Sequence, residues 1–486
     1  MTSLPRLGWH NRPHPNDVAT SERPRESNET LEVEMPNLQD LLDQVDELRD
    51  EIVALEQDLV RIPTVNTGFM PTGNETEVCE FMKAWLDVDG IDSQTIESAP
   101  GRGNFIARLE GSSGKAGLMF MSHTDVVPVE EEEKWRFPPF SATIADGRIY
   151  GRGANDCKAL LTCQLMAMRM LKRNGIPLND SLILASCADE EHGGRYGFGW
   201  LADNHPDRLA APLAVNEGGG TPIEAAGALT YMLGVGEKGR LQVEIDVKGT
   251  SAHASTPWQG TNALYRLAQA VQRIEQYEPE RDTSTGLFNY LSTFAIEDKP
   301  SPENIDQIIE DTQERNPRFA SILRALSRMT VTPTMINGGI KSNSVPESIR
   351  MTCDVRTLPH QDDSYVREQL GAMLEGIPGV DIEIDYMAVP NSSPFDTDFA
   401  QRIQAVTSMA LDRNDIQWVP AISTGFTDSR FTRPLGIVTY GFSGAHPDDD
   451  PMLNKNHGTD ESVGIKSLIS GTKIMLALAC DLLAAE

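Results

Sequence analysis

Four short apolar runs, each followed by histidine or acidic residues, narrow the possible folds of this chain more than any other feature. The runs are GLMFMSH, LILASCADE, APLAVNEGG and GIVTYGF. Helical stretches such as ALLTCQLMAMRMLKRNG alternate with them, a pattern typical of a largely parallel sheet flanked by helices. Because open α/β sheets bind ligands beyond the carboxyl ends of their strands, we expect the histidine and acidic residues to gather in one site.

The length of the chain and a change in its pattern of expected strands and helices predict two domains. A chain of 486 residues exceeds what one hydrophobic core usually supports. From about Arg240 the chain turns to alternating strands with helical stretches between them, and the parallel-sheet texture resumes near Asp396. We therefore expect an α+β domain inserted into a main domain. The expected bounds are 37–240 plus 393–486 for the main domain and 241–392 for the inserted domain.

The first residues differ in composition from the rest. Residues 1–36 are rich in Pro, Arg, Glu, Asn and Ser and hold too few large apolar groups to offset the entropy of ordering, so a flexible N-terminal arm is expected. From Leu38 apolar residues recur at steps of three and four, which predicts one amphipathic helix that Pro63 ends. A short coiled coil is the alternative for that stretch. Residues 280–330 show no pattern that places them.

The charge balance argues against one class of partner. The chain has 42 Lys and Arg against 72 Asp and Glu, a formal net charge of -30 at pH 7. Such a surplus repels phosphate backbones and anionic lipid surfaces at long range, so nucleic acid is not an expected partner. A solvated acidic surface is the ordinary interpretation, although a salt-adapted surface or a site that gathers cations would also produce this charge.

Cysteine usage and the opening segment indicate a compartment. The six cysteines show no C-x-x-C spacing, and most stand among apolar or small residues typical of buried thiols, which fits a reducing compartment. The opening segment MTSLPRLGWHNRPHP lacks a basic stretch followed by an apolar run, and no window approaches the roughly 18 apolar residues of a membrane span. We therefore expect a cytoplasmic protein without a membrane segment.

Two motifs supply a histidine and an aspartate. His123 ends an apolar run and Asp125 stands two positions later, and residues at i and i+2 of an extended chain point to the same face. Asp125 can therefore orient the imidazole, as carboxylates do behind metal-bound histidines. Asp156 lies in YGRGANDCK, where two glycines allow a tight path that presents the carboxylate end-on. Taken alone, Asp156 is better explained as a turn or cap residue.

Further acids and histidines follow the other runs. ADEEHGG contains Glu190 and Glu191 after Asp189, three adjacent acids whose repulsion a nearby cation would relieve; an exposed acidic loop is the alternative. One glutamate can bind a metal while its neighbour accepts a proton from water. Glu217 in NEGGG ends another run beside glycines that permit close backbone approach. His457 lies in NKNHGTDES. Together the motifs form a set of imidazole and carboxylate donors, for which zinc or cobalt is the expected metal.

The order of the motifs resembles a known family. HTDVV, YGRGANDCK, ADEEHGG, NEGGG, GTSAHAS, NSVPES, DVRTLP, TDSRF and NHGTDES are similar to the dinuclear-zinc peptidases and amidohydrolases, and the resemblance covers roughly residues 38–486. That family includes carboxypeptidase S, carboxypeptidase G, aminoacylases, acetylornithine deacetylase and succinyl-diaminopimelate desuccinylase. The resemblance implies a zinc-exopeptidase-like, mostly parallel sheet, with an inserted ferredoxin-like lid and dimerisation domain.

The resemblance also implies roles for the residues of the main domain. Two Zn²⁺ per chain are implied, with Co²⁺ or Mn²⁺ as substitutes. The ligands would form two sets that share one aspartate: His123, Asp156 and Glu217 for one ion, and Asp156, Glu191 and His457 for the other. Glu190 would be the general base that deprotonates water for attack on the amide carbonyl. Asp125 would support His123.

Three residues of the inserted domain receive roles in the same way. His253 in GTSAHAS would reach the active site of a partner subunit and stabilise the oxyanion, which implies a homodimer formed through the lid. Arg356 in DVR would receive a substrate carboxylate, a task that suits the guanidinium fork. Asn343 would lie near the substrate carbonyl.

The expected activity is hydrolysis of the amide bond of an N-acyl amino acid or of the C-terminal peptide bond of a short peptide. A catalytically silent relative that binds a metabolite or serves as an assembly subunit is the alternative, although retention of Glu190 beside all five ligands argues against it. A serine hydrolase is not supported, because GFSGA around Ser443 lacks the last glycine of G-x-S-x-G. Two departures from the family pattern stand out: Cys157–Leu160 reads Cys-Lys-Ala-Leu instead of Met-Lys-Gly-Gly, and the loop before His457 is acidic at 448–450.

Overall fold

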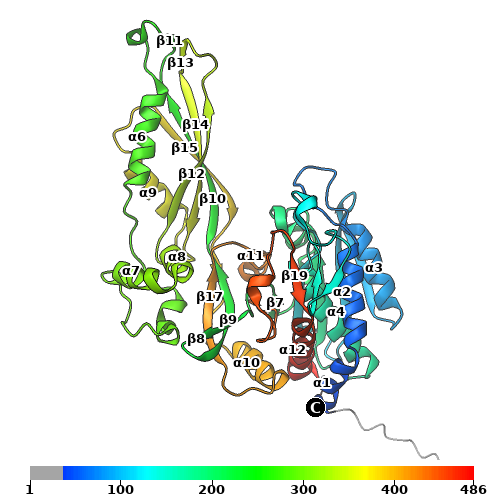
Figure 1. Cartoon of the computed structure of the whole chain (residues 1–486). Helices are drawn as coiled ribbons and strands as arrows, with labels where there is room; N and C mark the ends of the chain where they lie inside the picture. Colours follow the sequence, from blue (N-terminus) through cyan, green and yellow to red (C-terminus); the bar gives the residue numbers. More distant parts are fainter. Residues whose placement is uncertain (1–36, 486) are drawn as a thin grey trace, which may run out of the picture. The chain divides into compact units, whose positions relative to one another are not determined.

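The computed structural model describes residues 37–485, so the arm predicted for 1–36 lies outside the described residues. The larger sheet has ten strands (Figure 1). Its order is β1 (Asp92–Ala99), β2 (Arg102–Leu109), β6 (Ser181–Cys187), β3 (Ala116–His123), β7 (Leu213–Asn216), β18 (Val438–Gly441), β9 (Ala228–Glu237) and β16 (Asn391–Ser392), while β8 (Pro222–Ala225) and β17 (Gln417–Ser423) also pair with β9.

The directions of the strands divide this sheet into a parallel centre and antiparallel flanks. The neighbours from β6 through β3 and β7 to β18 are parallel, as are β9 and β17. The other pairs are antiparallel. β1 and β2 are joined by a short turn, and such a connection permits only antiparallel pairing. The predicted α/β class is therefore confirmed, and the sheet is mixed.

The strands at the centre of the sheet are buried on both faces. Along β3, Leu118 and Phe120 belong to one hydrophobic cluster, whereas Met119 and Met121 belong to another. Successive side chains of a strand point to opposite faces, so a continuous apolar run fits a strand that is covered on both sides. The first cluster includes residues of α3 (Glu75–Asp87), α4 (Lys158–Arg173), α10 (Asp398–Ala410) and α12 (Ile465–Leu483), and the second includes or contacts residues of α5 (Phe198–Asn204) and α11 (Ser429–Thr432).

The helix predicted from Leu38 onward forms as two helices. They are α1 (Leu38–Glu47) and α2 (Arg49–Arg61), divided at Leu48. Asn37 caps the first by accepting a hydrogen bond from the backbone N–H of Asp40. Both helices pack within the chain, α1 against α12 and α2 against α4, so one amphipathic surface lies on the protein and the coiled-coil alternative is not supported. Figure 1 shows the red α12 beside the blue α1.

A second, four-stranded antiparallel sheet follows β9 in the chain. Its order is β12 (Thr330–Gly338), β14 (Ser348–Thr357), β10 (Gly239–Lys248) and β15 (Val380–Ala388). Two helices pack with it around a hydrophobic cluster of their own, α6 (Ala263–Glu275) and α9 (Asp363–Leu374). The chain order β10–α6–β12–β14–α9–β15 is the βαββαβ arrangement of a ferredoxin-like fold.

The segment that the sequence did not place is helical. It forms a 3₁₀ stretch at Gly286–Phe294, α7 (Ile305–Arg315) and α8 (Pro317–Leu326). Leu287 and Leu291 belong to the large hydrophobic cluster together with Val419 of β17. This segment therefore shares the core of the larger sheet, although it lies in the chain between two strands of the smaller one.

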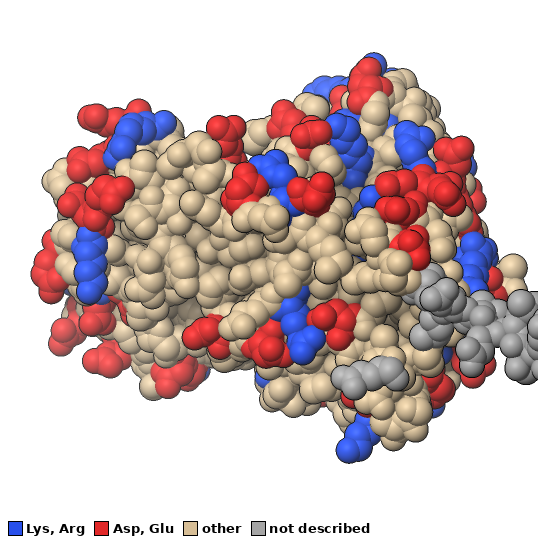
Figure 2. All heavy atoms as spheres, turned by 90° about the horizontal axis from the view of Figure 1, so that it is seen from below, with Lys and Arg blue, Asp and Glu red and all other residues tan. Residues whose placement is uncertain are grey.

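Two small pairings complete the described structure. A two-stranded antiparallel sheet pairs β11 (Ala252–His253) with β13 (Ser344–Val345). A three-stranded sheet contains β19 (Ser462–Gly464), β5 (Arg148–Tyr150) and β4 (Thr143–Ala145). Among the helices of residues 37–485, none is both long and apolar enough to cross a membrane. Figure 2 shows acidic and basic side chains interspersed on the face drawn, without a broad basic patch there, which fits a solvated surface of mixed charge.

Candidate metal centre

Asp156 lies between two histidines. Its Oδ1 is 3.1 Å from Nε2 of His123, and its Oδ2 is 3.2 Å from Nε2 of His457. Each histidine has one further carboxylate neighbour: Glu217 Oε1 lies 3.6 Å from His123 Nε2, and Glu191 Oε2 lies 3.0 Å from His457 Nε2. The structure therefore brings together the five residues predicted as ligands, in two groups that share one aspartate.

The ends of parallel strands deliver three of these side chains. His123 is the last residue of β3, Glu217 directly follows β7, and Glu191 lies in a short 3₁₀ turn after β6. Because these strands are parallel neighbours, their carboxyl ends lie at one edge of the sheet. Asp156 comes from the loop before α4, and His457 from the loop before β19. Strand ends therefore supply three of the five side chains, and loops supply the other two.

The glycines of NEGGG allow the backbone at Glu217 to approach its neighbours. A Cβ at Gly219 would lie 2.2 Å from the carbonyl oxygen of Gly441 and 2.6 Å from the backbone nitrogen of Gly234. No side chain fits there, so the close backbone approach expected from the motif is present.

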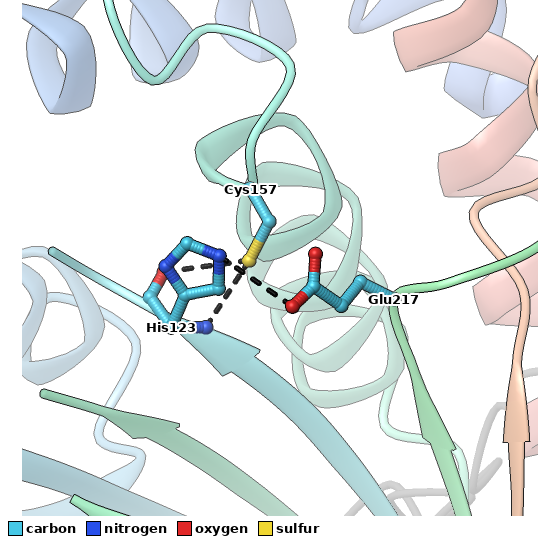
Figure 3. Close-up of side chains that lie close together, drawn as sticks. All are labelled: His123, Cys157 and Glu217. Atoms are coloured by element: carbon cyan, nitrogen blue, oxygen red, sulfur yellow. Dashed lines mark hydrogen bonds and ion pairs between the residues drawn. The ribbon is translucent and has the colours of Figure 1, made fainter. Parts of the chain in front are cut away.

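Cys157 is a neighbour that was not predicted as a ligand. Its Sγ accepts a hydrogen bond from the backbone N–H of His123 at 3.1 Å and donates to the His123 carbonyl oxygen at 3.5 Å. Donor atoms of His123, Cys157 and Glu217 lie within 4.8 Å of one another (Figure 3). Burial raises the pKa of the thiol to about 12. As a neutral thiol, Cys157 holds the backbone of His123 in place.

Asp125 joins His123 to the turn that carries two glutamates. Its Oδ1 lies 3.5 Å from Nδ1 of His123, and its backbone oxygen lies 2.9 Å from the same nitrogen. The two carboxylate oxygens also accept hydrogen bonds from the backbone N–H groups of Glu190 and Glu191, at 3.1 and 3.2 Å. Asp125 is fully buried, so one carboxylate sets the positions of the histidine and of this turn together.

Asp189, the first acid of ADEEHGG, contacts an arginine. Its Oδ1 accepts from Nη2 of Arg102 at 3.1 Å and from Nδ2 of Asn66 at 3.0 Å. Arg102 also pairs with Glu75 at 2.8 Å, and all three charged side chains are buried. The cation that relieves Asp189 is therefore Arg102, which the sequence pattern did not indicate.

The charges of the site are strongly coupled. Burial opposes ionisation of Asp156, but its hydrogen bonds to His123 and His457 outweigh burial and hold its pKa well below the usual range. The hydrogen bonds to Asp156 and Glu191 raise the pKa of His457 to about 10. Burial, reinforced by the charge of Glu217, raises the pKa of Glu190 well above its ordinary value. The site therefore gathers more acid than its own two imidazoles balance.

Glu461 holds the loop that carries Asp156. Its Oε1 accepts from the backbone N–H groups of Asn155 and Asp156 at 3.1 and 3.0 Å, and its Oε2 accepts from the N–H of Gly153 at 3.1 Å and from Arg152 Nη1 at 2.6 Å. The side chain is fully buried. Sequence analysis missed it, and its only signal is its place in NHGTDES, four residues after His457.

A second buried network lies behind Glu217. Asn216, the preceding residue, donates to the hydroxyls of Thr427 at 3.2 Å and Ser429 at 3.0 Å. The Thr427 hydroxyl donates to Glu237, the last residue of β9, and Arg433 pairs with Glu237 at 3.3 Å. The network therefore links the backbone beside Glu217 to the point where the chain leaves the larger sheet.

The three predicted residues of the smaller sheet region lie elsewhere. His253 is exposed, and its Nδ1 lies 2.7 Å from the hydroxyl of Ser255. Asn343 is also exposed and directly precedes β13, the strand that pairs with the strand of His253. Arg356 is ion-paired with Asp354 at 2.7 Å, and its Nη1 donates to the carbonyl oxygen of Thr424 at 3.0 Å. Within residues 37–485, no hydrogen bond or ion pair joins these three residues to the histidine and carboxylate cluster.

The cluster fits a divalent metal ion on its own chemistry. His123, Asp156 and Glu191 offer ligand atoms within 4.8 Å of one another. Oε1 of Glu191 is buried and has no hydrogen-bond partner among the described residues, an arrangement that costs free energy unless a cation or water completes it. Imidazole nitrogen and carboxylate oxygen are donors that zinc and similar ions accept.

This fold and donor set define a metallo-amidohydrolase. The chain belongs to peptidase family M20/M25/M40, whose model matches residues 119–481.

Two relatives of this chain carry different names. A probable succinyl-diaminopimelate desuccinylase of Staphylococcus aureus (strain MRSA252) is 27% identical over 382 residues, 78% of this chain and 85% of the relative. An uncharacterised carboxypeptidase of Schizosaccharomyces pombe is 29% identical over 335 residues, 66% of this chain and 56% of the relative.

Solved structures show the same fold. An M20 family metallo-carboxypeptidase of Sulfolobus solfataricus superimposes with a TM-score of 0.68 at 21% identity, covering 88% of this chain and 98% of that one. Human carnosine dipeptidase 1 gives a TM-score of 0.63 at 15% identity, over 92% and 98% of the two chains.

Proposed function

We propose that this chain hydrolyses the amide bond of an N-acyl amino acid or the C-terminal peptide bond of a short peptide, with two zinc ions at the cluster described above. The observation that carries the proposal is the position of Asp156, whose two oxygens face two different histidines, each with a carboxylate neighbour. A carboxylate whose two oxygens face separate donor groups could serve two metal ions at once.

The ligands in this proposal are those that the family resemblance implies. His123, Asp156 and Glu217 would hold one ion, and Asp156, Glu191 and His457 would hold the other. Zinc bound there supplies a Lewis acid for the scissile carbonyl and lowers the pKa of water. Co²⁺ and Mn²⁺ accept the same donors and are the expected substitutes.

Glu190 is the proposed general base. It adjoins Glu191, and its backbone N–H donates to Asp125. The charges of Glu217 and His123 act on its carboxyl group, which supports a place for that group beside the cluster. Glu190 is buried, and burial first and Glu217 next raise its pKa well above the ordinary value. Metal ions bound at the cluster would lower that pKa and leave the carboxylate free to accept a proton. In this role Glu190 takes a proton from the attacking water and delivers it to the leaving amine.

The proposed lid and dimerisation domain is 241–392, which contains nearly all of the four-stranded sheet. It is inserted into a proposed catalytic domain of 37–240 plus 393–486. The chain passes from β9 to β10 at Glu237–Gly239 and returns to the larger sheet at β16, which supports an insertion. In the proposed homodimer, the exposed His253 reaches the partner's site and stabilises the oxyanion, with Asn343 near the substrate carbonyl.

Arg356 is the proposed receptor of the substrate carboxylate. Its Nε and Nη2 donate to Asp354, and its Nη1 donates to the backbone carbonyl of Thr424. A substrate carboxylate can therefore replace the carbonyl contact and form the stronger, charge-assisted hydrogen bond.

A cytoplasmic location is part of the proposal. All six cysteines are free thiols, and none forms a disulfide, which suits a reducing compartment.

The experiment compares purified wild type with Glu190→Gln and, as a matched control, Glu133→Gln, which changes an exposed glutamate that no hydrogen bond or ion pair of the described residues joins to the cluster. Metal content per chain is measured by elemental analysis, and hydrolysis is measured on N-acyl amino acids and dipeptides before and after chelation. Near two metal ions per chain with chelator-sensitive cleavage is expected. Glu190→Gln should keep the metals and lose about 10²–10⁴-fold in kcat. Full activity of Glu190→Gln, or metal-independent cleavage, would exclude the mechanism.

A further inference from the structure

A cavity of about 350 Å³ adjoins the metal centre on the side of Glu217. Cys157 and Glu217 form part of its wall, so a group in the cavity would lie next to the cluster (Figure 3). The rest of the wall comes from β9, β17 and the beginnings of α4 and α12, with loops between them. Its volume suits a small side chain or acyl group.

The wall is electrically neutral apart from Glu217. Its other members are apolar, hydroxyl, thiol, amide or glycine residues, and it includes no Lys, Arg or Asp. No side chain of the wall would pair with an ionised group placed there, and that group would lose its hydration, a costly transfer.

Several polar side chains of the wall already have partners within the protein. Nδ2 of Asn155 donates to Oδ1 of Asn456 at 2.8 Å, and Oδ1 of Asn454 accepts from Arg148 at 2.5 Å. The Ser443 hydroxyl donates to the carbonyl oxygen of Gly219 at 3.1 Å.

The Ser467 hydroxyl donates to Asp449 at 2.6 Å, and the Cys163 thiol donates to the Leu468 carbonyl at 3.4 Å. Because these atoms are engaged within the protein, the wall offers few of its hydrogen bonds to a polar guest, and its lack of charged partners favours an uncharged group.

The wall also contains the departure from the family pattern. Ala159 and Leu160 stand where the pattern has two glycines, and both line the cavity from the first turn of α4. Leu160 is only 4% exposed, so its side chain occupies space that a glycine would leave empty. These two residues limit how large a group can enter.

We propose that this cavity binds the uncharged, apolar part of the substrate, and that the enzyme therefore acts on N-acyl amino acids or peptides whose group next to the scissile bond is neutral. This assignment rests on the proposed function and names its substrate class. It excludes a second carboxylate at that position, as in a succinyl group. The apolar group is either the acyl chain or an amino-acid side chain, two sources of the same chemistry.

The test uses pairs of substrates that differ in charge and little in shape. N-(4-methylpentanoyl)-L-alanine is compared with N-succinyl-L-alanine, which varies the acyl group, and N-acetyl-L-methionine with N-acetyl-L-glutamate, which varies the side chain. The zinc-loaded wild type should prefer the neutral member of one pair by about 100-fold or more in kcat/KM, because an unpaired carboxylate would be buried in the other. The pair that shows the preference identifies which group enters the cavity.

Two variants test the wall itself. Met232→Lys adds a cation to a partly exposed part of the wall and should raise kcat/KM for the charged member of that pair by about 10-fold relative to the neutral member. Leu160→Ala enlarges the cavity and should shift preference toward longer acyl chains or side chains. Leu165→Ala is the matched control, because Leu165 is a buried leucine of the same helix that does not line the cavity.

The outcomes separate this inference from the proposed function. If the metal-loaded protein cleaves none of the substrates, the proposed function is wrong. If it cleaves both members of each pair equally well, the proposed function stands and the cavity assignment is wrong. The assignment is also overturned if Leu160→Ala and Leu165→Ala change the length preference to the same extent. If Met232→Lys does not fold, the wild-type ratios and the leucine variants still decide.

Discussion

The clearest structural prediction concerns Glu461, which contacts no predicted ligand side chain but holds the loop of Asp156. Each of its two oxygens accepts two hydrogen bonds. Three of the four come from backbone N–H groups and one comes from Arg152. In Glu461→Gln the shape is kept, but one oxygen becomes an NH₂ group that can only donate. That NH₂ group would face two N–H donors, whichever way the amide is turned.

The size of the effect follows from these contacts. Each buried donor left without an acceptor costs about 1–3 kcal/mol, so the two lost bonds cost about 2–6 kcal/mol in total. Part of this lowers the free energy of unfolding, and part loosens the loop that presents Asp156. Loss of a residue that orients a metal ligand typically lowers metal affinity about 10–100-fold, and we expect Glu461→Gln to fall in that range.

The assay is competition for zinc with a chelator of known affinity, together with thermal unfolding of the metal-free protein. Glu56→Gln is the matched control, because Glu56 is an equally buried glutamate whose single partner is the hydroxyl of Thr162 at 2.7 Å. Burial raises the pKa of Glu56 to about 8, so near pH 7 it is mostly protonated and the change to glutamine alters little. Glu461→Gln should lose zinc at a chelator concentration that leaves Glu56→Gln loaded. A folded Glu461→Gln that binds zinc as tightly as wild type would refute the reasoning.

Other predictions follow from the same contacts. His457→Ala should bind about one metal ion fewer per chain than wild type, measured by elemental analysis, because it removes the one imidazole of the group formed with Glu191; unchanged stoichiometry would contradict this ligand set. Arg356→Ala should raise KM for substrates with a free carboxylate by about 10-fold or more and leave their methyl esters little changed, since the charge-assisted bond is lost; an equal loss on the esters would show that Arg356 does not bind the carboxylate. Thr427→Val should lower kcat while the protein stays folded, because it disconnects Asn216 from Glu237 behind Glu217, and a kcat equal to that of wild type would show that the network does not position Glu217.

Much of the site could be predicted from local sequence. His123, Glu190, Glu191 and Glu217 follow apolar runs that become neighbouring parallel strands, and the carboxyl ends of such strands meet at one edge of the sheet. Position along the strand therefore determines position in the site. The helical stretches expected between the strands of the inserted domain form as α6 and α9, since the apolar period is a property of each segment alone.

Other features depended on contacts that no single segment contains. The break at Leu48, the helices within 280–330 and the antiparallel flanks of the sheet follow from packing and connection lengths. Asp189 was grouped with its acidic neighbours, and only the fold shows that Arg102 is its partner, 87 positions away.

The sequence by itself determined which groups are available for chemistry: two imidazoles and a set of carboxylates at strand ends and glycine turns, in an order shared with a known family. The tertiary structure decided what holds those groups and what lies beside them. Glu461 reaches the loop of Asp156 across 305 positions, and the cavity beside Glu217 is walled by residues from Asn155 to Ser467. Hydrogen-bond geometry and enclosed space depend on atoms that come close only when distant segments pack together, and for that reason neither can be read from the spacing within a motif.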